Sequence, residues 1–127
     1  MNEAEPLYRE ALEGSRRTLG DTHPDTLVNI NNLGLLLKAQ GKLSEAEPFY
    51  REALEVRRRT LGDTHPSTLT SINNLAVLLQ AQGRLGKAEP LFREALHGAK
   101  KTLGDAHPYT VAFQENLDLL LQKMGKS

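Results

Sequence analysis

The chain has 127 residues, and its 16 basic and 16 acidic side chains give a formal net charge of zero. This balance argues against a nucleic-acid partner or a membrane surface, since proteins that bind either usually carry a basic excess. The absence of cysteine excludes disulfides and thiolate metal sites, and it suits a reducing compartment such as the cytoplasm. No apolar run approaches the length of a membrane span.

One segment of the sequence recurs at a constant step of 42 residues. It reads RTLGDTHP at residues 17–24 and again at 59–66, and it returns as KTLGDAHP at 101–108. A repeat with such a period indicates an array of similar structural units, each stacked on its neighbours. We therefore expect one repeat domain over residues 1–127.

Glycine and proline mark the expected ends and starts of helices in chain order. A first helix should end before Gly20, a second should begin at Pro24 and end before Gly41, and the same signals then recur. The pattern predicts an all-α protein with six helices, near residues 3–19, 24–40, 44–61, 66–82, 86–103 and 108–124.

The first, third and fifth of these helices carry a different start signal. Asn2, Ser44 and Gly86 each stand three residues before a glutamate, which is the place of an N-cap residue in a capping box. Pro48 and Pro90 should then fall in the first helical turn, where the missing N–H is harmless.

Each expected helix also has one apolar stripe. The second helix presents Ile30, Leu33 and Leu37 on one face together with the small residue Gly34, at the spacing of an amphipathic helix. The stripe of the third helix consists of Ala46, Phe49, Tyr50, Ala53 and Leu54. Gly34 should allow the two helices to approach closely beside Tyr50.

This order of residue sizes resembles the tetratricopeptide-repeat signature. Large, large, small and large residues on a helix A (Ile30 to Leu37) precede small, aromatic and small residues on a helix B (Ala46 to Ala53). The usual repeat has 34 residues, and the 42-residue form is similar to the repeats of kinesin light chains and nephrocystin-type proteins. The resemblance implies a right-handed superhelical solenoid of antiparallel helix pairs.

The resemblance further implies a concave groove, lined by the A helices, that binds an extended peptide of a partner protein. Asparagine suits this role because its amide can both donate to and accept from a peptide backbone. A structural role, with one asparagine of each adjacent pair bonding a neighbouring helix or loop, is the alternative. The residues expected to face the groove are Asn31, Asn32, Leu35, Lys38, Thr70, Asn73, Asn74, Val77, Gln80 and Asn116.

The sequence offers no pattern of catalytic residues, phosphate-binding loop or cofactor motif, so we expect neither an enzyme nor a cofactor. His23, His65 and His107 recur with the repeat, and equivalent points of stacked repeats lie too far apart to share one ion. We expect each histidine to cap its own A helix, or to pack in the loop between repeats, instead of binding a metal.

The two ends of the sequence differ from its middle. Gln114, Asp118 and Lys123 replace apolar residues of earlier A helices, as expected for a polar helix that caps the array. The chain starts with a B helix, whose apolar face should be partly open and should form a weak two-fold homodimer. The interface residues would be Ala4, Leu7, Tyr8 and Ala11. A structural spacer or self-association element without a peptide ligand is the alternative function.

Overall fold

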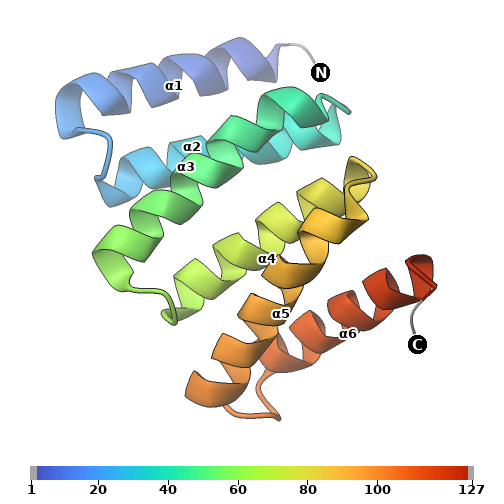
Figure 1. Ribbon diagram of the computed structural model, residues 1–127. Coiled ribbons are helices and arrows are strands. Elements are labelled where there is room, and N and C mark those ends of the chain that lie inside the picture. Colours follow the sequence, from blue (N-terminus) through green and yellow to red (C-terminus); the bar gives the residue numbers. More distant parts are fainter. Residues whose placement is uncertain (1–2, 126–127) are drawn as a thin grey trace. The chain divides into compact units, whose positions relative to one another are not determined.

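The computed structural model describes residues 3–125. Within these residues the chain forms six helices and no strand (Figure 1): α1 (Ala4–Leu19), α2 (Pro24–Ala39), α3 (Leu43–Leu61), α4 (Pro66–Ala81), α5 (Leu85–Thr102) and α6 (Pro108–Lys123). Every described boundary lies within one residue of its predicted position, which confirms the all-α prediction. We refer to α2, α4 and α6 as A-type helices and to α1, α3 and α5 as B-type helices.

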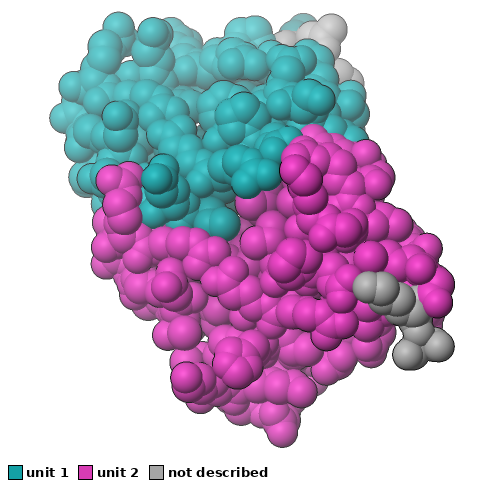
Figure 2. All heavy atoms as spheres, in the orientation of Figure 1, with its two compact units in different colours: residues 1–56 teal, residues 57–127 magenta. Residues whose placement is uncertain are grey.

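The chain divides into two compact units, Met1–Val56 (unit 1) and Arg57–Ser127 (unit 2), coloured separately in Figure 2. In unit 1, α1 packs against α2. In unit 2, α5 packs against both α4 and α6. The helix α3 contributes residues to both units.

All three A-type helices begin with the same cap. The Nδ1 atoms of His23, His65 and His107 accept hydrogen bonds from the backbone N–H two residues later, at 3.0, 3.1 and 3.0 Å. A proline follows each histidine as the first helical residue, where its fixed φ fits the helix. The expected capping role of the histidines is therefore confirmed.

The capping signal predicted for α3 and α5 is wrong. Helices α3 and α5 begin at Leu43 and Leu85, so Ser44 and Gly86 lie inside the first turn. Pro48 and Pro90 consequently lie in the second turn instead of the first. Asn2 lies outside the described residues.

The turn that ends each preceding helix explains these earlier starts. Gly41 has φ +79°, its N–H donates to Lys38 O, and the N–H of Lys42 donates to Leu37 O at 2.8 Å, the two bonds of a Schellman motif. The carbonyl of Lys42 then already accepts from Ala46 N at 3.0 Å. The new helix thus starts directly after the motif.

The predicted apolar stripes form the core of each unit. In unit 1, Ile30, Leu33 and Leu37 are fully buried. A Cβ atom at Gly34 would lie 2.7 Å from the Tyr50 ring, which confirms that this small residue allows close packing. Phe49 departs from the prediction because it is only half-buried. In unit 2, the ring of Phe92 is fully buried.

Candidate functional site

In unit 1, the exposed stripe of α2 contains two of the predicted groove residues. Asn32 is exposed and Leu35 is 44% exposed, one helical turn from Asn32 and on the same face. Val28, 52% exposed, extends this stripe toward the start of the helix. Asn31 and Lys38 lie at its edge and are half-buried. This face of α2 is thus open to a ligand.

A hollow of about 270 Å³ lies beside this stripe. It is lined by Asn32, Leu35 and Leu36 of α2 together with Tyr8 of α1. The sequence assigned Tyr8 only to an oligomer interface, whereas the structure brings it next to two predicted groove residues. A rule based on A-type helices alone could not find this B-type residue.

In unit 2, the corresponding face of α4 is more covered. Thr70, Asn74, Val77 and Gln80 are half-buried. Thr70, Asn74 and Val77 follow one another at helical spacing, which places them on one stripe. Each of these side chains keeps part of its surface accessible to a ligand.

The side chains of Asn73 and Asn116 are hydrogen-bonded to each other in unit 2. The Nδ2 atom of Asn116 donates to Oδ1 of Asn73 at 3.1 Å, and Asn73 is only 9% exposed. This bond between α4 and α6 matches the structural role considered for one asparagine of each pair. Asn116 is half-buried and retains an amide oxygen and a second N–H.

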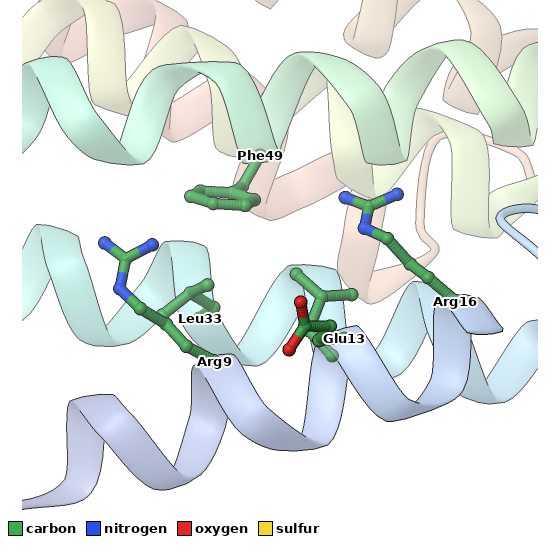
Figure 3. A pocket seen from close by; sticks show the side chains of 6 residues that line it. Arg9, Glu13, Arg16, Leu33 and Phe49 are labelled. Atoms are coloured by element: carbon green, nitrogen blue, oxygen red, sulfur yellow. The ribbon is translucent and has the colours of Figure 1, made fainter.

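A second hollow, of about 280 Å³, lies in unit 1 (Figure 3). Leu12, Leu33 and Phe49 supply its apolar lining, and Arg9, Glu13 and Arg16 supply its polar groups. The half-exposed position of Phe49 is explained by this hollow, which its ring borders. No predicted groove residue lines it.

Carboxylates already pair with both arginines of this hollow. Arg16 binds Glu52 through two bonds of 2.6 and 2.8 Å and Asp21 through one of 2.9 Å. The bonds to Glu52 are the main reason that the pKa of Arg16 is raised. Arg9 donates to Glu5 at 3.0 Å. The cations are therefore structural and offer little net charge to an anionic ligand.

The arrangement around Arg16 recurs in unit 2. Arg58 binds Glu94 at 2.6 and 3.0 Å and Asp63 at 3.1 Å, and the bonds to Glu94 raise the pKa of Arg58. We call these two arrangements the arginine clasps. The arginine clasps were not predicted from the sequence, although a recurring arginine and glutamate, 36 residues apart in both copies, could have indicated them.

Within residues 3–125, no group of three or more His, Asp or Glu side chains is arranged so as to hold a metal ion. None of the helices in this part of the chain is long and apolar enough to cross a membrane.

The sequence matches the tetratricopeptide-repeat family model over residues 1–59 and 28–101, so the chain belongs to this family. Its repeats are of the kinesin light chain type. A solved structure of nearly identical TPR-like repeats, from a kinesin light chain-like protein of P. anserina, is 30% identical to the chain with a TM-score of 0.89. A variant form of that protein is 28% identical, with the same TM-score.

A third similar structure, BtubC (BKLC) from P. vanneervenii, is 25% identical with a TM-score of 0.82. The matches cover 97–98% of this chain, but only 59% of either P. anserina chain and 48% of BtubC. The chain thus spans less than two thirds of these proteins. No curated protein matches it. The family and these structures assign the chain to the protein-interaction repeat scaffolds.

Proposed function

We propose that the chain binds an extended peptide segment of a partner protein along the exposed faces of its A-type helices. The hollow beside Asn32 carries this proposal. It combines the exposed amide of Asn32 with the apolar surface of Leu35 and the ring of Tyr8. An amide next to an apolar hollow can hold a peptide backbone while the hollow accepts a side chain.

The asparagines supply the backbone contacts in this proposal. Asn32 and Asn74 occupy equivalent positions of successive repeats, and each amide can pair with a peptide group whatever the peptide sequence. Asn116 would act in the same way, with its orientation set by the bond to Asn73. Asn73 itself acts as a positioning residue because it is largely buried.

The charge of these faces favours an uncharged peptide. Among the predicted groove residues, Lys38 alone is charged, and it is half-buried. Leu35 and Val77 would contact apolar side chains of the peptide. The class of ligand that fits is therefore a neutral, extended segment with an aliphatic or small aromatic side chain for the hollow.

A screen of random peptides displayed on phage, followed by calorimetry, tests the proposal. Replacing Asn32 and Asn74 together by alanine should weaken a selected peptide by about 1–3 kcal/mol, the scale of two hydrogen bonds. Arg51→Ala is the matched control, because Arg51 pairs with Glu47 at 2.8 Å on a B-type helix and should leave binding unchanged.

Two results would overturn the proposal. A selected peptide whose affinity survives the double substitution would bind elsewhere on the chain. A screen that yields no binder would favour the structural-spacer alternative.

A further inference from the structure

One face of α1 is open although the same face of α5 is buried. The 42-residue period aligns Tyr8 with Phe92 and Ala11 with Ala95. Phe92 and Ala95 are 0% exposed, and α5 packs against the A-type helix that precedes it, α4. By contrast, Tyr8 is 40% exposed and its neighbour Leu7 is 64% exposed. The open face of α1 is thus shaped to pack against an A-type helix.

The helix α6 is an A-type helix with an open face of its own. It aligns with α4, so that Val111 corresponds to Leu69. Leu69 is 1% exposed, whereas Val111 is 45% exposed. A hollow of about 370 Å³ lies at this place, and it is lined by Lys100, Asp105, Thr110, Val111, Gln114 and Glu115.

The two arginine clasps show what fills the equivalent place elsewhere in the chain. Lys100 and Asp105 align with Arg58 and Asp63, and Arg58 holds Glu94 of α5. Among the described residues, Lys100 has no such glutamate. The hollow therefore lacks the carboxylate of a B-type helix.

In unit 2 the packing of this B-type helix also requires a small residue. A Cβ atom at Gly98, one turn after Glu94, would lie 2.6 Å from Leu69 Cδ2. The helix α1 meets both requirements, since Glu10 aligns with Glu94 and Gly14 aligns with Gly98. Glu10 is exposed, and a Cβ atom at Gly14 would meet nothing within 4 Å.

We propose that α1 of one copy docks on α5 and α6 of a second copy, head to tail, with Glu10 against Lys100 and Gly14 against Val111. The contact repeats the packing of α5 on α4 and the arginine clasp of unit 2. It uses the interface residues predicted from the sequence, but it pairs them with a different surface from the expected two-fold contact. A head-to-tail contact leaves one free end on each copy, so it does not stop at two chains.

The association is weaker than the packing inside unit 2. Gln114 and Asp118 take the places of Ile72 and Ala76, which are fully buried, and burying polar groups opposes the contact. The ammonium group of Lys100 is also a single point charge, whereas the guanidinium of Arg58 binds a carboxylate in a bidentate manner. We therefore expect the copies to associate only at high concentration.

Charge reversal tests the proposal by sedimentation equilibrium of the whole chain over a concentration series. Glu10→Lys and Lys100→Glu should each weaken association about fivefold or more, since each replaces an attraction by a repulsion. A mixture of the two variants should associate again, because the two reversed charges then face each other with opposite signs. Lys101→Glu, an exposed neighbour with the same change of charge, should have no effect.

Three outcomes would overturn the proposal. The first is a mass that stays at one chain up to millimolar concentration. The second is a dimer indifferent to Lys100→Glu, which would indicate the two-fold contact through α1. The third is the absence of rescue on mixing, once circular dichroism has shown that both variants are folded.

Discussion

At the scale of single residues, Glu5 ties the start of α1 to the turn before α3. Its Oε1 accepts a hydrogen bond from Lys42 Nζ at 2.9 Å, and its Oε2 accepts one from Arg9 Nε at 3.0 Å. These bonds, with that of Lys42 the stronger influence, hold the pKa of Glu5 below its ordinary value of 4.5. The carboxylate form is therefore favoured by folding.

This lowered pKa predicts how the contact responds to acid. Because the folded pKa lies below the ordinary value of 4.5, the stabilisation is complete well above that pH and is lost progressively as the pH falls through the folded pKa. A carboxyl NMR titration should give Glu5 a midpoint below 4.5, and Lys42→Met should raise that midpoint. A midpoint that does not respond to Lys42→Met would contradict this account.

Glycine and alanine act at the same scale by their small size. The Tyr50 ring occupies the space that a side chain at Gly34 would fill, at 2.7 Å from the ideal Cβ position. The aligned positions in unit 2 are Ala76 and Phe92. The order of residue sizes was therefore sufficient to predict this packing, since small and aromatic residues must face each other for the helices to touch.

At the scale of helices, the sequence predicted the A-type starts better than the B-type starts. An A-type helix begins with a histidine and a proline, two local signals that act on their own helix. A B-type helix such as α3 or α5 begins where a Schellman motif has just ended. Its first residue follows from the geometry of the preceding turn, so that Ser44 resembles a cap without being one.

The histidine caps give a prediction at this scale. His65→Ala removes the acceptor for Ser67 N and should lower the free energy of unfolding by about 1 kcal/mol, the typical value of an N-cap side chain. His65→Asn should retain most of the stability, because asparagine is among the best N-cap residues. Urea unfolding followed by circular dichroism measures both changes.

His97→Ala provides the control for this experiment. His97 is exposed in the middle of α5, and its replacement should change the unfolding free energy by less than about 0.5 kcal/mol. Equal losses from His65→Ala and His65→Asn would mean that the cap is not what histidine contributes.

At the scale of the whole molecule, the 42-residue period predicts which residues occupy equivalent positions. It does not predict which residues each of them contacts. The class of repeat and the exposed stripe of α2 follow from spacing alone. The burial of Asn73 does not, because it depends on how closely α6 approaches α4. The arginine clasps likewise depend on helix packing, because the packing decides which carboxylate lies within reach of each guanidinium.

The polar face of α6 is partly as predicted. Asp118 is exposed and accepts a bond from Gln114 at 2.9 Å, consistent with a helix that faces water. The interpretation of Lys123 is wrong, however. It aligns with Ala39 and Ala81, and both of these alanines are exposed. That position lies outside the packed face in all three A-type helices, so a lysine there replaces no core residue.

The last prediction concerns Gln114 and Asp118 of α6, which stand at the positions that Ile72 and Ala76 occupy in α4. The double variant Gln114→Ile, Asp118→Ala restores the residues that are fully buried in α4 as Ile72 and Ala76. It removes polar groups that oppose burial and adds apolar surface for α1 to cover. Sedimentation should then show the chain associating at about tenfold lower concentration or less, in species larger than a dimer.

Two further variants decide whether α1 is the helix that covers this new surface. Leu7→Glu in the same background should reverse the association, because it places a charge on the open face of α1, where Leu7 is 64% exposed. Gln122→Ala, a substitution at an exposed position elsewhere on α6, should leave the association of the double variant unchanged. Association that persists with Leu7→Glu would instead mean that two copies of α6 pack on each other, and the role assigned to α1 would be wrong.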